Sequence, residues 1–366
     1  MPAATEPVKA WGKRQNVDLQ NDKYGIKIFA KFGTVKRRVQ MRLSVRLIAL
    51  GLITMWGAKR GLAQQDPQFS LYMFNQQVLN PAYCGAPRAP QIIAGGRSQW
   101  IGIDGQPNTV TLSGNMPVDF LRGGVGLHIL HDRIGPFNAT GVKLAYAFRQ
   151  PIGKQGVAIQ IGISPGFFFR NLDGTGWRPP ETYADDVIQR VTGLISANNF
   201  DLDFGVFLHK APMTERENGD KFWFGFSANH LTNPRLKNFG ANFEILPSFN
   251  ITGGYRFLDG PISIVPSAFL KFVGNQFQFD VNANVHVRPM VFGLGYRGLM
   301  NTESIIGIVG FHASQRLFFA YSYDFLISAL GQASSGSHEL VLTYTFPRVF
   351  KYYPLDLDTK HKPMVR

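Results

Sequence analysis

Apolar and polar residues alternate along most of the chain beyond about residue 90. In the clearest segment, 277–287, Phe, Val and Ala at the odd positions alternate with Gln, Asp, Asn and His at the even ones. Neighbouring side chains of a β-strand point to opposite faces, so this period of two predicts a strand with one apolar and one polar face. Fourteen segments show the pattern, namely 91–100, 108–117, 123–132, 139–149, 155–169, 198–209, 221–230, 246–257, 262–272, 276–287, 291–297, 304–312, 317–327 and 338–346.

The number and length of these segments decide between two classes of fold. An even number of strands of about ten residues is typical of outer-membrane barrels, whereas strands of a soluble β-sandwich usually have about five or six residues. Hydrocarbon offers no hydrogen-bond partner to an open sheet edge, so a sheet that spans a membrane has to close. We therefore predict an all-β fold, a transmembrane antiparallel β-barrel of about 14 strands over residues 91–346, with its apolar faces against lipid.

The connections between the predicted strands alternate in length. Those after even-numbered strands are mostly short, and those after odd-numbered strands include the long segments 170–197, 231–245 and 328–337. Two connections depart from this rule, a long one at 210–220 and a tight one at 273–275. Short periplasmic turns and long external loops are typical of outer-membrane barrels. We predict that the protein lies in the cell outer membrane with both termini in the periplasm.

The two ends of the chain differ from the barrel in composition. Residues 1–63 carry thirteen Lys and Arg against three Asp and Glu, which leaves 25 basic and 21 acidic residues in the rest of a chain of net charge +14. Residues 41–63 have a basic start, a short apolar run and a small-x-small end, the layout of a secretory signal peptide. Residues 1–40 are then a disordered extension, or they result from a translation start assigned upstream of the true one. The alternative is a basic arm that binds nucleic acid. Residues 347–366 are predicted to be a periplasmic tail.

Candidates for enzymatic or metal chemistry are weak. His128 and His131 are three residues apart and so face opposite sides of a strand, and the side chains of Ser337 and His338 diverge as neighbours in a strand. The single cysteine, Cys84, is expected to be a buried or unreactive thiol. Glycine clusters such as 123–126 lack the strand–loop–helix context of a phosphate-binding loop, so we expect them to face neighbouring strands or turn hairpins. We predict no enzyme activity, no cofactor and no metal.

The polar faces of the predicted strands line the inside of the barrel. There they either coat a water-filled pore or hold an inserted segment, and the pattern leaves both open. The lumen-facing candidates are Arg97, Gln99, Asp201, Asp203, Arg256, Asp280, Asn282 and Asn284.

Residues 64–90 do not alternate, and they are rich in particular side chains. They contain QDPQFSLYMFN at 65–75 and NPAYCG at 80–85. Here the chain resembles the PorP/SprF family, outer-membrane proteins of the type IX secretion system of Bacteroidota, and the resemblance continues through motifs at 97–107, 132–136, 249–257, 321–324 and 336–340. Cys84 stands where the family more often has a small residue, and the tail runs past the usual terminal aromatic.

The resemblance implies a non-enzymatic outer-membrane barrel that supports secretion or surface retention of adhesins and other cargo, and gliding motility. It implies partners among other type IX components, including periplasmic peptidoglycan-linked proteins, and none among nucleic acids. Residues 64–90 would lie in the periplasm or fold into the lumen, either as a partner-binding segment or as a plug without a partner. An outer-membrane solute channel or transporter is the alternative function.

We hypothesise that four residues of this segment are apolar anchors and that three cap its turns. The anchors are Phe69, Tyr72, Met73 and Tyr83; the caps are Asp66, Asn75 and Asn80; Pro81 is a further contact candidate.

Overall fold

A computed structural model describes most of the chain from Asp66 to Pro347. The described residues are 66–87, 89–153, 156–173, 194–210, 220–233, 235–236, 243–258, 260–299 and 303–347. The predictions for the extension 1–40, the signal peptide 41–63 and the tail beyond 347 lie outside the described residues.

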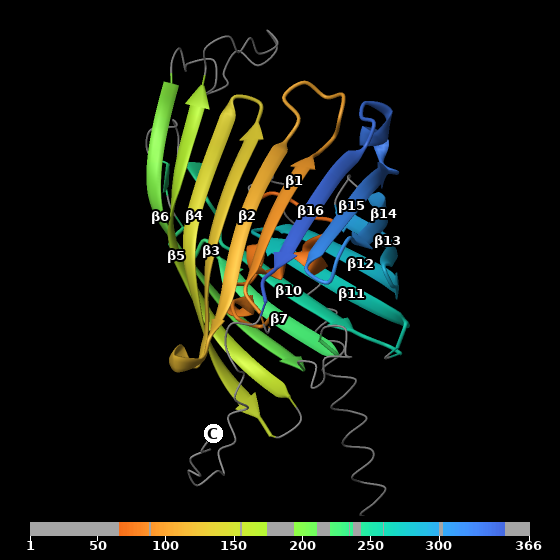
Figure 1. Cartoon of the computed structure of the whole chain (residues 1–366). Helices are drawn as coiled ribbons and strands as arrows, with labels where there is room; N and C mark the ends of the chain where they lie inside the picture. The colour runs from red at the N-terminus through yellow and green to blue at the C-terminus, as the bar shows by residue number, and fades with distance from the viewer. Residues whose placement is uncertain are drawn as a thin grey trace, which may run out of the picture. The chain divides into compact units, whose positions relative to one another are not determined.

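Fourteen antiparallel strands form one closed barrel, as predicted (Figure 1). Each strand pairs with its neighbours in chain order, and β1 pairs with β16 to close the ring, with Gln91 opposite Thr345. The barrel strands are β1 (Gln91–Ser98), β2 (Asn108–Val118), β3 (Gly123–Ile134), β4 (Phe137–Ile152), β5 (Val157–Asp173), β6 (Leu194–Lys210), β7 (Phe222–Asn229), β10 (Ser248–Tyr255), β11 (Ile262–Val273), β12 (Gln276–Val287), β13 (Met290–Leu299), β14 (Ser304–His312), β15 (Leu317–Leu326) and β16 (Ser337–Thr345).

Three strands are longer than the sequence pattern predicts. β4 has 16 residues, and β5 and β6 have 17 each, so the predicted connection 170–197 begins only after Asp173. Pro151 and the asparagines at 171, 198 and 199 look like turn residues in the sequence, but they pair in the ladder. The connection after β7 also holds a small hairpin, β8 (Arg235–Leu236) and β9 (Phe243–Glu244), which the pattern did not predict.

The two faces of the barrel have opposite character. Outward side chains are apolar and exposed, such as Leu144 at 63% and Leu294 at 65%, as expected for a surface that meets lipid. Inward positions are mostly polar and yet buried, which requires that something fills the lumen. No helix among the described residues is long and apolar enough to cross a membrane.

Two rims define directions inside the barrel. We call the rim where β1 begins and β16 ends the lower rim, since it lies toward the bottom of Figure 1. Short turns join strands there, including the 3₁₀ turn η4 (Asp119–Leu121) between β2 and β3. The opposite, upper rim carries the connections 99–107 and 327–336, the second of which contains the turn η7 (Ala329–Gln332).

Candidate functional site: a plug in the barrel lumen

Residues 66–87 and 89–90 lie inside the barrel and cross it from one rim toward the other (Figure 1). We call these residues the plug. Asp66 pairs with Lys271, near the upper end of β11, and the carbonyl of Pro90 accepts a hydrogen bond from Phe346 at the lower rim. Between these ends the plug forms three 3₁₀ turns, η1 (Tyr72–Phe74), η2 (Gln76–Val78) and η3 (Pro81–Tyr83).

Glycines on the wall strands β3, β5, β6 and β7 let the plug approach closely. A Cβ at Gly162 would lie 2.5 Å from the amide nitrogen of Ala82, and one at Gly205 would lie 2.0 Å from Oδ1 of Asn80. The same holds on β3, where a Cβ at Gly126 would lie 2.4 Å from Sγ of Cys84. We call these positions the glycine track, comprising Gly124, Gly126, Gly162, Gly205 and Gly225. Side chains of ordinary size there would exclude the plug.

The glycine track corrects one prediction from the sequence. The cluster 123–126 was expected to face neighbouring strands or turn hairpins, and Gly123 does lie against the backbone of Ala147 on β4. Gly124 and Gly126, however, face the plug, at Gly85 and Cys84. Cys84 is fully buried as predicted, and burial raises the pKa of its thiol to about 12.

Two plug amides bind the wall through its backbone. Nε2 of Gln77 donates to the carbonyls of Gly114 and Leu127, at 3.1 and 3.0 Å. Nδ2 of Asn80 donates to the carbonyls of Val206 and Phe226, at 3.0 and 3.2 Å. Each amide thus bridges two paired strands. Because a buried carbonyl left without a partner costs free energy, these bonds favour the docked plug.

A belt of buried charges holds the start of η1. Arg97 pairs with Asp324 at 2.7 Å and with Glu339 at 3.0 Å. Arg297 pairs with Asp280 at 2.7 Å and with Asp324 at 3.0 Å. These five side chains, 0–3% exposed, come from β1, β12, β13, β15 and β16. We call them the charge belt.

The plug completes the charge belt. Two guanidinium groups face three carboxylates, so one carboxylate needs other donors. The backbone N–H groups of Ser70 and Leu71 donate to Glu339 at 2.6 and 3.2 Å, and Oγ of Ser70 donates to Asp324 at 2.7 Å. Nη2 of Arg297 in turn donates to the carbonyl of Phe69 at 3.0 Å. Buried charges demand such partners, so wall and plug form one network.

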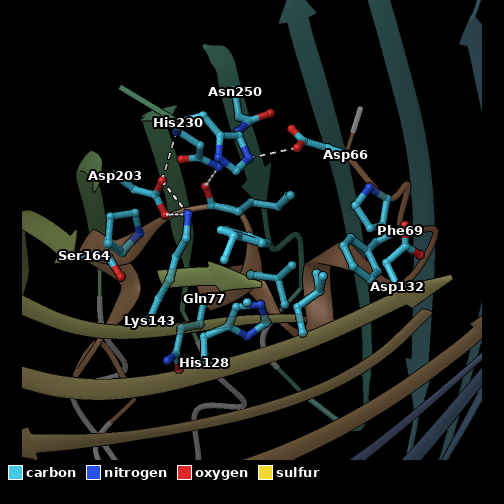
Figure 2. Close-up of a pocket in the computed structure, with 18 of the residues that line it drawn as sticks. Asp66, Phe69, Gln77, His128, Asp132, Lys143, Ser164, Asp203, His230 and Asn250 are labelled. Carbon is cyan, nitrogen blue, oxygen red and sulfur yellow. Dashed lines mark hydrogen bonds and ion pairs between the residues drawn. The ribbon is translucent and has the colours of Figure 1, made fainter. Parts of the chain in front are cut away.

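A second cluster of charges holds the first residue of the plug (Figure 2). Asp66 accepts from Nε2 of His230 at 2.9 Å and from Lys271 at 3.1 Å. Nδ1 of His230 donates to Asp201 at 2.6 Å, and Lys143 lies 2.7 Å from both Asp201 and Asp203. Both ring nitrogens of His230 therefore face carboxylates, which can only accept when they are ionised, so both nitrogens carry a proton and the ring is an imidazolium.

The pKa values of His230 and Asp66, which lie outside the strands, agree with the assignment of an imidazolium. Burial disfavours the charge on His230, but Asp66 and Asp201 outweigh it and raise its pKa to about 9. Burial also opposes ionisation of Asp66, but Lys271 and His230 hold the pKa of this carboxyl well below its usual value. At neutral pH the three cations Lys143, Lys271 and His230 balance three carboxylates.

The second cluster includes the one group of described residues whose geometry could hold a metal ion. Atoms of Asp201, Asp203 and His230 lie within 4.8 Å of one another. The ammonium of Lys143, however, lies between the two carboxylates, at 2.7 Å from each. A lysine in that position already balances the carboxylates, so the donor set fits an ion-pair network better than a metal site.

A small cavity of about 90 Å³ lies between the plug and the wall beside the second cluster (Figure 2). Both charged and apolar side chains line it, including Asp66, Phe69, His128 and Lys143. Since a water molecule occupies about 30 Å³ of liquid, the cavity has room for a few waters.

The plug residues singled out from the sequence all lie against the wall. Tyr72 is buried, its ring lies tilted against that of Phe269 with the ring centroids 5.3 Å apart, and its hydroxyl donates to Ser267. Tyr83 meets Phe207 edge-on at 5.4 Å. Phe69 and Met73 are partly buried against the apolar cluster of Tyr72.

Only one of the three hypothesised caps forms as expected. Oδ1 of Asn80 accepts from the N–H of Ala82 at 2.9 Å, with Pro81 in the first position of η3. Asn75 makes no cap, because its Nδ2 donates instead to Ser113 on β2. Asp66 forms the ion pairs described above. In both corrections the side chain binds the wall, a choice that local sequence cannot reveal.

All eight lumen-facing candidates are buried, at 0–9% exposure. Arg97, Asp280, Asp201 and Asp203 lie in the two charged clusters. Gln99 donates to Gln68 of the plug, and Asn282 donates to the hydroxyl of Tyr72. Arg256 and Asn284 lie lower, and Nη1 of Arg256 donates to Ser263.

The sequence reasoning missed several residues that hold the plug. Lys143, Lys271 and Arg297 stand in the inward phase of their strands, so the alternation itself could have identified them. His230 follows the end of β7, where no periodicity applies.

A family model described as "Type IX secretion system membrane protein PorP/SprF" matches residues 61–344. No curated protein matches the chain significantly. Among solved structures, the chain is similar to the outer membrane protein Omp33 of Acinetobacter baumannii, with 10% identity, 70% of this chain and 99% of that chain covered, and a TM-score of 0.40.

Two further solved structures are similar. The CymD monoaromatic hydrocarbon channel is 13% identical, with 78% of this chain and 95% of that chain covered and a TM-score of 0.44. The toluene transporter TbuX of Ralstonia pickettii is 10% identical, with 73% and 92% covered and a TM-score of 0.43.

Proposed function

The chain belongs to the PorP/SprF family of type IX secretion system membrane proteins, and from this premise we propose that it supports secretion or surface retention of adhesins and other cargo through protein contacts. Gliding motility is part of the proposal where the cargo is a motility adhesin. The partners we propose are other type IX components, including periplasmic peptidoglycan-linked proteins, together with the cargo itself. The barrel surface contacts outer-membrane lipid.

The plugged lumen is the observation that carries the proposal. A solute channel needs a continuous polar path, but here the polar lumen residues bind the plug. Arg97 and Arg297, together with their three carboxylates, lie at 0–3% exposure under Ser70 and Leu71. A barrel that uses its polar interior for an internal segment offers its rims and loops to partners.

We further propose that the lower rim faces the periplasm. The two ends of the barrel, Gln91 and Thr345, pair there, and the turn between β2 and β3 is short. The long connections at the upper rim, after β5 and β7, would then face the cell exterior and the cargo. Asp66, the first residue of the plug, lies toward the upper rim. We therefore propose a periplasmic position for the two ends of the barrel and not for the start of the plug.

Deletion of residues 66–85 tests the proposal by separating folding from secretion. Barrel folding is measured as the gel-mobility shift on boiling in detergent, and secretion as cargo on the cell surface. We expect a folded barrel with lost secretion. A second experiment measures the conductance of the wild-type barrel in planar lipid bilayers. We expect no steady conductance, whereas a steady open pore would favour a solute channel.

A further inference from the structure

The plug fills the lumen only in part. Besides the cavity of about 90 Å³ at the second cluster, a cavity of about 560 Å³ lies between the plug and the lower rim. Phe74, Gln76 and Tyr83 of the plug line it, together with residues at the turns of that rim such as Pro261 and Gln315. Protein interiors ordinarily contain few voids larger than a water molecule. The plug thus has free space beside it, unlike a segment packed into a core.

The docked plug also leaves buried polar groups unpaired on both sides of the contact. On the plug, the side-chain oxygens of Asn75, Gln76 and Gln77 have no hydrogen-bond partner among the described residues. On the wall, the same is true of Oε1 of Gln160 and of both polar atoms of the Asn115 side chain. A buried polar group without a partner destabilises the state that buries it. Docking therefore has an unfavourable component, which disappears when the plug leaves the wall.

The wall contacts features of the plug that other peptides share. The carbonyls of Val206 and Phe226 accept from the side-chain amide of Asn80. Gly162 admits the main chain that follows this amide, and Glu339 accepts from two main-chain N–H groups. Every peptide has a main chain, and both Asn and Gln supply an amide. The contacts that hold the plug are therefore open to a segment of another protein.

From these observations we propose that the inner wall is a peptide-binding groove, in which the plug is an intramolecular ligand that a segment of a partner protein replaces. The replacing segment presents an Asn or Gln amide to the carbonyls of Val206 and Phe226 and lays its main chain on the glycine track. The cavity at the lower rim gives it room to enter. The inference rests on the proposed function only for the compartment from which the segment enters.

The test measures displacement of the plug in the full-length Asn80→Ala barrel in detergent. In this variant the plug loses two hydrogen bonds to the wall. The competitor is a synthetic peptide with the sequence of residues 66–87, in which Cys84→Ser removes the thiol. Cys84 of the barrel is buried while its own plug is docked, so the rate of maleimide labelling reports displacement.

The control peptide also carries Asn80→Ala, so it lacks the amide that the groove binds. Two hydrogen bonds favour the first peptide over the control about 30-fold. A tethered plug has an effective concentration of about 1 mM, so at about 0.1 mM the first peptide should displace about three quarters of the plugs and the control about one tenth. We therefore expect labelling to be about eightfold faster with the first peptide. Equal labelling rates with the two peptides would overturn the proposal.

A crosslink locates the bound peptide. In the docked plug the ring of Tyr83 lies 5.4 Å from that of Phe207 on β6, between centroids. A photoreactive phenylalanine at this position of the peptide should therefore crosslink to β6 near Phe207. The gel-mobility shift on boiling verifies that the barrel is folded. Crosslinks confined to outward, lipid-facing residues would mean that the peptide binds the outer surface, and the groove would be wrong. Cargo secretion is scored separately in cells, so the proposed function can stand when peptide binding fails.

Discussion

Replacement of Gly162 by valine should lift the lower half of the plug from the wall. The new Cβ would lie 2.5 Å from the nitrogen of Ala82, 2.6 Å from its Cα and 2.7 Å from the carbonyl carbon of Pro81. All three are backbone atoms, which cannot rotate away as a side chain can. Overpacking of this kind costs about 1–3 kcal/mol, and a rigid neighbour favours the upper value. About 3 kcal/mol raises the population of the undocked plug about 150-fold.

The single cysteine of the chain reports this change without any added label. Cys84 is fully buried in the docked plug, and burial raises its thiol pKa to about 12, so maleimide should react with it very slowly. In Gly162→Val, labelling by a membrane-impermeant maleimide should accelerate about 150-fold, in proportion to the undocked population.

A matched control distinguishes undocking from a general effect of valine in a strand. A Cβ at Gly307 meets nothing within 4 Å, so Gly307→Val should leave the labelling rate of Cys84 within about twofold. The gel-mobility shift on boiling must show that both variants are folded. Should a folded Gly162→Val barrel keep Cys84 as unreactive as in the wild type, our account of the glycine track would be wrong.

Three further predictions concern the polar contacts. Arg297→Met leaves Asp280 with an unpaired buried charge and should lower the free energy of unfolding in urea by about 3–5 kcal/mol, with partial recovery when Asp280→Leu is added. The folded pKa of His230, about 9, exceeds its unfolded value of about 6.5, so its stabilisation is complete below pH 6.5 and lost as the pH rises through 9. The melting temperatures of wild type and His230→Gln should therefore converge above about pH 9, and a constant gap would contradict the imidazolium assignment. Asn80→Ala removes the two hydrogen bonds of about 1 kcal/mol each that join this side chain to the wall and should accelerate labelling of Cys84 by about 30-fold, whereas an unchanged rate would mean that these bonds do not hold the plug.

The barrel could be predicted from the sequence because its physical cause is local. Lipid on one face and a polar interior on the other impose a period of two on each strand, and a run such as 277–287 shows it without knowledge of its neighbours. Strand ends were less certain. Pro151 and Asn199 look like turn residues, yet both pair in the ladder of β4 to β6.

The plug and its contacts depend on distant residues, so the sequence alone could not reveal them. The arrangement of Arg97 with Asp324 joins positions 227 residues apart and exists only because β1 closes onto β16. Asn75 could equally cap its own turn or bind the wall, and only the position of Ser113 decides for the wall. Alternation identified lumen-facing positions without telling whether water or a protein segment covers them.

The glycine track also constrains how the sequence of this family can diverge. The side chains of residues 84 and 126 compete for one shared volume, as do those of residues 80 and 205. A larger side chain on the plug is compatible only with glycine on the wall, as with Cys84 opposite Gly126. Substitutions at these pairs should therefore covary among homologues, and a homologue with a bulky residue at the wall position should have a shortened or rerouted plug.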